Sequence, residues 1–118
     1  NGKKYTVKTR SIDSLCDEFS IDGFDLIKID IEGSELQALR GASQMLLNYS
    51  SIIILEINPK LLQLSSINHI DILNFMETYG YLGRLIFDNF KLGPLGYIAT
   101  EKTRNAIFAK IDHWNNIL

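Results

Sequence analysis

Cysteine is almost absent from this chain of 118 residues, and Cys16 alone cannot form an internal disulfide. A single thiol fits a protein kept in a reducing compartment, so we expect a cytoplasmic location. Long apolar runs are also missing, because no stretch approaches the roughly 20 residues that cross a bilayer. Positive charge is not in excess, since 12 Lys and Arg stand against 14 Asp and Glu, for a net charge of −2. The composition therefore predicts no membrane span and no nucleic-acid partner.

Several motifs that would point to a particular chemistry are absent as well. No P-loop and no Gly-x-Gly-x-x-Gly turn occurs, so the sequence contains no recognisable phosphate cradle. Ser34 follows a glycine, but the Gly-x-Ser-x-Gly motif of a nucleophile elbow is incomplete. His69 and His113 have no partner at ligand spacing, and we expect both at the surface. The chain starts at Asn1 instead of an initiator Met, which suggests a fragment.

The most informative stretch is an apolar strand that ends in acids, within residues 24–35. With a period of two, its isoleucines point to one face, while Lys28 and Asp30 point to the other. A run this apolar is typical of a strand buried inside a parallel sheet. Asp30 and Glu32 gather where the strand ends, just before a turn at Gly33. Because ligands of open α/β sheets bind beyond the carboxyl ends of the strands, we interpret this edge as the working rim of an enzyme.

The rest of the chain alternates helical and strand patterns, which predicts one α/β folding unit. The predicted elements are an edge strand at residues 5–9, a helix from Ser11 ended by Gly23, a strand at 25–31, a helix at 34–47, a strand at 52–57, a loop at 60–67, a helix from Asn68 ended by Gly80, strands at 82–87 and 106–110, and a turn around Trp114. Two apolar strands joined by a helix predict a right-handed βαβ unit with parallel strands.

Five polar residues at the ends of two neighbouring strands are the main candidates for chemistry. Asp30 and Glu32 follow the first strand, where a carboxylate can orient an acceptor group or take its proton. Glu56 and Asn58 end the next strand on the same face. Neighbouring parallel strands lie roughly 4.8 Å apart, so Glu56 and Asp30 could converge on one ligand. Lys28 lies one pleat before Asp30, and it can either tune the charge of that carboxylate or act directly.

Structural roles stay open for these residues and are favoured for some others. The acids at the strand ends can equally pair with cations or cap the following helix. Asp13 and Glu35 lie in first helical turns, where the helix dipole favours an acid, although Asp13 is retained as a residue that could tune the site. Cys16 lies on an apolar stripe and fits the core. Two carboxylates suit a hard cation such as magnesium, but without a third ligand we predict no metal site, and a divalent metal is the less favoured alternative.

Four blocks of residues together resemble one known family. They are TRSIDSL at 9–15, DLIKIDIEGSEL at 25–36, LRGA at 39–42 and ILEI at 54–57. A looser likeness at residues 79–81 and 104–108 extends the similarity from Thr9 to Lys110. The combination of the KIDIEG block with the LRGA helix behind it is the specific part. On these residues the chain resembles the FkbM family of S-adenosylmethionine-dependent methyltransferases.

The resemblance implies a Rossmann-like class I methyltransferase fold, with a mostly parallel sheet and an antiparallel closing strand. It implies S-adenosylmethionine as cofactor and methyl transfer to an oxygen of a small-molecule or glycan acceptor, such as a sugar, lipid or natural product. The glycine-rich turn and the ribose-binding acid of such folds have no counterpart here. Residues 1–118 would then be a single partial domain, the C-terminal half, with an exposed sheet edge where the missing N-terminal strands belong. We expect this half to be inactive alone, and its cofactor-binding residues are not identified.

Roles for the acids follow from the same resemblance. Methyl transfer requires the acceptor oxygen to be held in line with the methyl group, with a carboxylate nearby to accept or steer the proton. Asp30 is predicted to be that carboxylate. Glu32 and Glu56 are predicted to shape the pocket, and Lys28 to tune their charge.

Two other interpretations compete with this one. Residues 26–30 also resemble a barrel strand of EAL-type cyclic-dinucleotide phosphodiesterases, but that family would next need further barrel strands with acidic metal ligands. Here a single apolar strand that ends in Asn58 and Pro59 follows instead. The second alternative is a half-domain without catalysis, which would serve as a binding or structural module.

Overall fold

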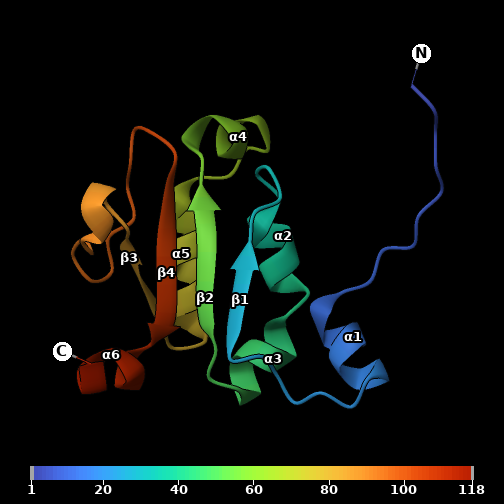
Figure 1. Cartoon of the computed structure of the whole chain (residues 1–118), viewed down its shortest axis with the longest axis horizontal. Coiled ribbons are helices and arrows are strands. Elements are labelled where there is room, and N and C mark those ends of the chain that lie inside the picture. The colour runs from blue at the N-terminus through green and yellow to red at the C-terminus, as the bar shows by residue number, and fades with distance from the viewer. Residues whose placement is uncertain (1, 118) are drawn as a thin grey trace.

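The computed structural model describes residues 2–117 and shows one sheet with helices packed against it (Figure 1). In chain order the elements are α1 (Ile12–Glu18), β1 (Leu26–Ile29), α2 (Glu35–Arg40), α3 (Ser43–Asn48), β2 (Ile52–Ile57), α4 (Pro59–Leu64), α5 (His69–Thr78), β3 (Tyr81–Leu85), the 3₁₀ turn η1 (Asp88–Phe90), β4 (Arg104–Lys110) and α6 (Ile111–Ile117). The strand predicted at residues 52–57 is confirmed with those bounds.

The four strands within residues 2–117 lie in the order β1-β2-β4-β3. β1 and β2 pair in parallel, which confirms the predicted parallel neighbours. β4 lies between β2 and β3 and runs antiparallel to both. β1, β2 and β3 therefore share one direction, but only the first pairing is parallel. The fold is a mixed α/β fold, and the mostly parallel character predicted for the sheet is not confirmed.

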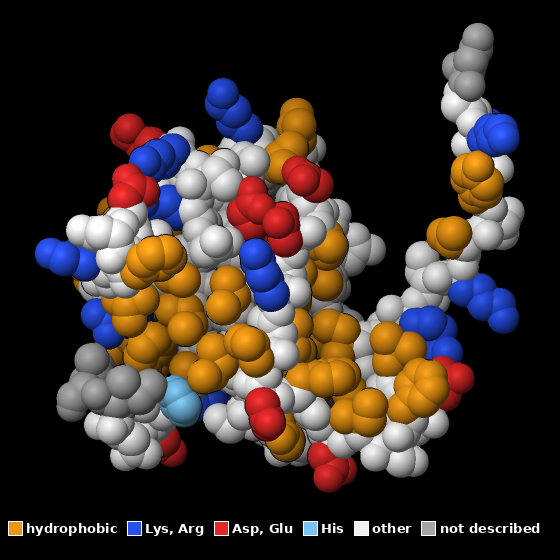
Figure 2. Space-filling view, viewed as in Figure 1, with side chains coloured by type: hydrophobic (Ala, Val, Ile, Leu, Met, Phe, Trp, Pro, Cys, Tyr) orange, Lys and Arg blue, Asp and Glu red, His pale blue; other side chains and the backbone are white. Residues whose placement is uncertain are grey.

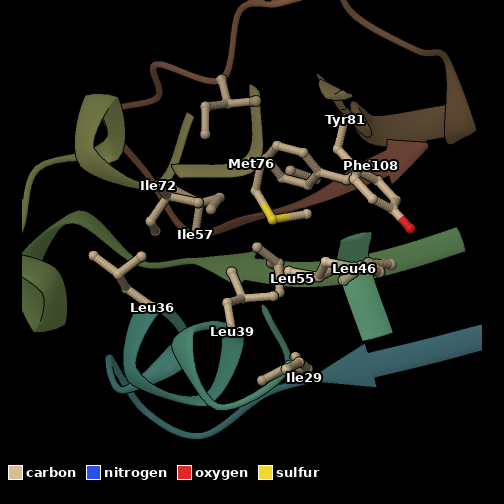
Figure 3. Packing of buried hydrophobic residues seen from close by; sticks show 14 of the residues in the cluster. Ile29, Leu36, Leu39, Leu46, Leu55, Ile57, Ile72, Met76, Tyr81 and Phe108 are labelled. Atoms are coloured by element: carbon tan, nitrogen blue, oxygen red, sulfur yellow. The ribbon is translucent and has the colours of Figure 1, made fainter. Parts of the chain in front are cut away.

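Helices α2, α3 and α5 lie over one face of the sheet, which we call the covered face, and α4 lies at the end of β2 (Figure 1). The core lies between these helices and the strands (Figure 3). From β2, Ile53, Leu55 and Ile57 point into it and are each at most 1% exposed. Leu39 of α2 and Met76 of α5 are equally buried in the same cluster. Because burial alternates along β2, every second residue of this strand lies on the opposite face.

The opposite face, which we call the open face, has no helix over β1 and β2 (Figure 1). It is nevertheless rich in apolar side chains, and Figure 2 shows hydrophobic groups spread across it. Leu26 of β1 is 60% exposed. Ile52 and Ile54 of β2 and Ile107 of β4 are only half-buried. The strands are therefore apolar on both sides, as predicted for a doubly covered sheet, but only one side is covered.

The edge strand predicted at residues 5–9 is wrong. Residues 2–11 form neither helix nor strand and are exposed along their whole length. Figure 1 shows this segment running away from the sheet, next to none of the strands. An extended segment gains no stable strand structure without a neighbouring strand to pair with. The β-branched residues of this segment favour a strand, but among the described residues no neighbouring strand pairs with it.

The single helix predicted over residues 34–47 is two helices, broken at Gly41. The Asp13 backbone N–H of α1 donates to the Gly41 carbonyl oxygen at 2.8 Å. The Asp13 carboxylate accepts the N–H groups of Gln44 at 2.9 Å and Met45 at 3.0 Å. α1 thus docks at the break and caps the start of α3, which replaces the hydrogen bonds that a continuous helix would make.

The loop predicted at residues 60–67 is also wrong in its first part, because α4 begins at Pro59. The Asn58 side chain accepts the Leu61 N–H at 3.2 Å. An Asn-Pro pair ends a strand, but it is equally the start signal of a helix, with the cap at Asn58 and proline in the first turn. The helix start predicted at Asn68 is confirmed, with Asp71 completing a reciprocal capping box.

The turn predicted around Trp114 is part of helix α6, which packs against β3. The Trp114 Nε1–H group donates to the Leu82 carbonyl oxygen at 2.9 Å. The guanidinium of Arg84 lies 5.4 Å from the centre of the indole ring. Trp114 is only 2% exposed, so the end of the described chain is part of the packed structure.

Candidate functional site

Asp30 directly follows β1 and Glu56 is the last but one residue of β2, at the same end of the parallel pair. Ile29 of β1 is in register with Leu55 of β2, so the next residue of each strand is the other's neighbour. Ile29 and Leu55 point to the covered face, and alternation therefore places Asp30 and Glu56 on the open face. The register confirms that these two residues adjoin at the carboxyl end of the sheet, as predicted. Their catalytic roles stay predictions.

The Glu56 carboxyl has a pKa raised above its ordinary value of 4.5. The largest cause is a hydrogen bond with Asp30, which the protonated Glu56 carboxyl donates. Partial burial adds to the rise, followed by the negative charges of Asp30, Glu32 and Glu35. A carboxyl group whose pKa is raised by a neighbouring acid is a candidate for proton transfer. Such a pair can hold a hydroxyl group and exchange a proton with it.

Glu32 lies in the turn that follows β1, beside this pair. Its backbone has φ +59°, and Gly33 after it has φ +98°. The left-handed conformation costs a residue with a Cβ roughly 1–2 kcal/mol, so the surrounding structure must hold this turn. The Glu32 side chain is exposed, and its charge contributes to the raised pKa of Glu56. The structure thus brings the three predicted acids, Asp30, Glu32 and Glu56, to one rim.

Glu35 is the residue whose importance sequence reasoning missed. The sequence favoured a helix-dipole role for it, but its side chain is 1% exposed. Its Oε2 atom accepts the Ile31 N–H at 3.0 Å and the Gly33 N–H at 3.2 Å. Ser34, at the cap position of α2, makes no side-chain hydrogen bond to the helix. The sequence feature that could have indicated this role is an acid two residues after the turn glycine, from where its carboxylate can fold back and accept hydrogen bonds from the turn.

The remaining predicted site residues occupy other positions. Lys28 is exposed on the open face, in register with Ile54 and one pleat before Asp30. It makes no ion pair among the described residues, and Figure 2 shows basic and acidic side chains close together on this face. Asn58 caps α4 and Asp13 caps α3, so the structure gives both of them capping contacts.

Two hollows flank the carboxyl ends of β1 and β2. One, of about 400 Å³, lies beyond β2 and is lined by residues of α4, α5 and the segment before β4, including Asn68, His69 and Thr100. The other, of about 440 Å³, includes Ile31, Ser34 and residues of the N-terminal segment. Neither is lined by the three acids, which lie on the open rim between them.

Two features of the described residues bear on a metal or a cofactor. Among residues 2–117, no group of three or more His, Cys, Asp and Glu side chains could hold a metal ion. Gly33 makes a strand-turn-helix with β1 and α2, which in form resembles a cofactor-binding turn. However, a Cβ at Gly33 would lie 3.0 Å from the Leu61 carbonyl oxygen, so this glycine accommodates α4 of the same chain. A side chain at this position would therefore crowd the backbone of α4.

Comparison with protein families identifies the family of the chain. A family model described as the methyltransferase FkbM domain matches residues 1–82, more than half of the 118 residues. The chain belongs to the FkbM methyltransferase family. The FkbM match contains β1, β2 and all three acids, and it ends within β3. No curated protein and no solved structure matches the chain.

The FkbM match confirms the family that the sequence motifs indicated. Of the looser likeness, residues 79–81 lie within the matched residues, whereas residues 104–108 lie beyond them. One further finding concerns membranes: none of the helices within residues 2–117 has both the length and the apolar character to cross a bilayer.

Proposed function

We propose that this FkbM domain is the acceptor-side part of a methyltransferase that methylates a hydroxyl oxygen of a small molecule or glycan. The observation that carries the proposal is the pair of carboxyl groups, Asp30 and Glu56, at the carboxyl ends of two parallel strands. In open α/β sheets this is the edge where ligands bind. The substrate class, sugar, lipid or natural product, comes from the family alone.

Asp30 is proposed as the residue that orients the acceptor hydroxyl and takes its proton. It is exposed at the rim and therefore within reach of a ligand. Glu56 is less exposed, and its raised pKa favours its protonated form, which suits a proton donor. Glu32 would bound the acceptor on the turn side. Lys28, one pleat away, would contribute a positive charge beside the acids of the rim.

The chain is further proposed to be a partial domain whose other half completes a Rossmann-like sheet and provides the S-adenosylmethionine site. Two observations support this. β1 pairs only with β2 in the described structure, so its other edge is free. A hollow of about 360 Å³ with mainly apolar walls lies between this edge and α1, lined by Ile12, Leu15, Phe24, Leu26, Ile27 and Lys28. A free edge beside an apolar hollow is what an additional strand would fill. A cytoplasmic location belongs to the same proposal, with the buried free thiol of Cys16 compatible with it.

The proposal is tested by methyl transfer with the whole protein that carries this sequence. S-adenosylmethionine with a labelled methyl group is the probe, and incorporation into a small-molecule and glycan extract is measured. We expect Asp30→Asn to reduce the rate about 10²–10⁴-fold, the usual contribution of a positioned base. Asp71→Asn is the matched control, because Asp71 is an acid of the α5 capping box and not of the rim.

Near-normal turnover of Asp30→Asn, with unchanged stability, would remove Asp30 from the proposed role. No transfer by the wild-type protein with any fraction of the extract would instead favour the non-catalytic half-domain. The two outcomes separate a wrong residue from a wrong function.

A further inference from the structure

The turn between β1 and α2 needs an explanation that the proposed roles of the acids do not supply. It connects the strand that carries Asp30 to the helix behind it, and it includes Glu32 in the left-handed region at φ +59°. Non-glycine residues rarely adopt this conformation unless other contacts enforce it. The question is which side chain enforces it here.

Glu35 is the side chain that meets the requirement. The left-handed conformation of Glu32 turns the N–H groups on either side of it, those of Ile31 and Gly33, toward one point. A single carboxylate oxygen of Glu35 accepts both, at 3.0 Å and 3.2 Å. Successive backbone N–H groups arranged in this way form an anion-binding concavity, and here the anion is internal.

Because the Glu35 carboxylate is buried, water cannot take the place of its hydrogen bonds to the two backbone N–H groups. Glu35 is 1% exposed, and no buried side-chain oxygen or nitrogen among the described residues lacks a hydrogen-bond partner. A buried carboxylate is costly unless hydrogen bonds compensate it, so its two N–H partners and the carboxylate stabilise one another. The turn is therefore held from inside, by a residue that is itself hidden from any ligand.

We infer that Glu35 is a positioning residue, which holds the turn after β1 so that Asp30 and Glu32 project toward Glu56. The inference rests on the proposed function for its catalytic meaning, since it deepens the account of that same rim. Glu35 does not contact the acceptor. It acts through the backbone of Ile31 and Gly33, and the consequence is the proximity that couples Asp30 to Glu56.

The chain offers a matched control for the loss of stability that any change at a buried residue brings. Leu36 follows Glu35 in α2 and is 2% exposed, but it belongs to the apolar core and its side chain can form no hydrogen bond with the turn. Leu36→Ala should therefore destabilise the protein without releasing the turn. Glu35→Ala removes both hydrogen bonds, and Glu35→Gln retains one oxygen that can accept them.

The experiment measures amide hydrogen exchange at Ile31 and Gly33 and the titration midpoint of Glu56, by NMR on the whole protein. In Glu35→Ala we expect exchange at these two amides to rise about tenfold or more relative to Leu36→Ala, the effect of losing one hydrogen bond. We also expect the Glu56 midpoint to fall further in Glu35→Ala than in Glu35→Gln, because both variants remove the negative charge of Glu35 but only Glu35→Ala removes the oxygen that holds the turn. Glu35→Gln should restore most of the exchange protection, and it serves as the test if Glu35→Ala does not fold.

The inference is overturned if Glu35→Ala and Leu36→Ala give the same exchange at Ile31 and Gly33, or if Glu35→Gln behaves like Glu35→Ala. An equal Glu56 midpoint in Glu35→Ala and Glu35→Gln also overturns it, because only the lost negative charge, and not the turn, would then act on the carboxyl pair. None of these readouts requires methyl transfer. Failure of the proposed function, seen as normal turnover in Asp30→Asn, is therefore distinguishable from failure of the role given to Glu35.

Discussion

The covered face and the open face of the sheet are built from the same strands, but their side chains differ in how deeply they are buried. On β2, Leu55 is fully buried against the helices, while its neighbour Ile54 on the other face is only half-buried. On β1, Ile29 is 7% exposed and Leu26 is 60% exposed. Both faces are apolar in sequence, so composition alone does not distinguish them.

The difference lies in which face of the sheet is covered by helices of the described residues. The covered face has a closed core with helices supplied by the chain itself. The open face has the same kind of side chains and no helix of this chain over β1 and β2 (Figures 1 and 2). The acids sit on this second face, at its carboxyl end. A reacting rim beside an uncovered apolar surface is consistent with the proposed partial domain, whose other half would cover it.

The largest effect is expected from truncating matched residues on the two faces. Leu55→Ala should reduce the free energy of unfolding by about 2–5 kcal/mol, because it opens a cavity in a packed core. Ile54→Ala, one residue away, should cost clearly less, since its side chain is only half-buried. Urea unfolding of both variants measures the difference. Equal losses would mean that the open face is covered in solution.

A second comparison concerns crowding on the covered face. Gly83 of β3 is in register with Phe108, and a Cβ at this position would lie 2.5 Å from the phenyl ring. Since Phe108 is fully buried, its ring can shift only by disturbing the surrounding core, and Gly83→Ala should cost about 1–3 kcal/mol through overpacking. Gly80→Ala is the control, because a Cβ there meets no atom within 4 Å and only the backbone at φ +82° is strained.

Thermal unfolding of the two glycine variants separates these causes. Destabilisation of Gly83→Ala together with an ordered but displaced Phe108 ring would confirm steric crowding. A Gly83→Ala variant as stable as wild type would show that the core near Phe108 is looser than its burial indicates.

The smallest effect is expected at the rim, and it depends on pH. The pKa of Glu56 is raised in the folded protein, so the unfolded chain ionises first as the pH rises through 4.5. Ionisation then favours the unfolded state, and stability is lost between 4.5 and the folded-state pKa and stays lower above it. Glu56→Gln removes this loss. The variant should therefore gain stability relative to wild type above that range, with a smaller difference below 4.5. A pH-independent difference would contradict this.

The sequence was sufficient for the parts of the fold that depend on local pattern. The apolar run of β2 and the capping box that starts α5 at Asn68 follow from short stretches and were predicted correctly. The neighbouring positions of Asp30 and Glu56 also follow, because two apolar strands joined by a helix pair in parallel.

The features that were not predicted depend on contacts between distant segments. The break at Gly41 is made by Asp13 of α1, which donates to Gly41 and caps α3. The strand expected at residues 5–9 lacks a partner, which no local pattern reveals. Glu35 has the sequence position of a helix-dipole acid, and only the turn at φ +59° shows why its carboxylate is buried. The role of Glu35 depends on the conformation of the turn, which the residue types alone do not predict.

The central claim is that the tips of β1 and β2 bring two carboxyl groups into one interacting pair. The most direct test is an NMR titration of the Glu56 side-chain carboxyl in the wild-type protein and in Asp30→Asn. We expect a wild-type midpoint above 4.5 that falls when Asp30 is replaced, because the hydrogen bond and the negative charge of Asp30 are the main sources of the shift besides burial. A wild-type midpoint at or below 4.5, unchanged in Asp30→Asn, would contradict the pair and with it the proposed site.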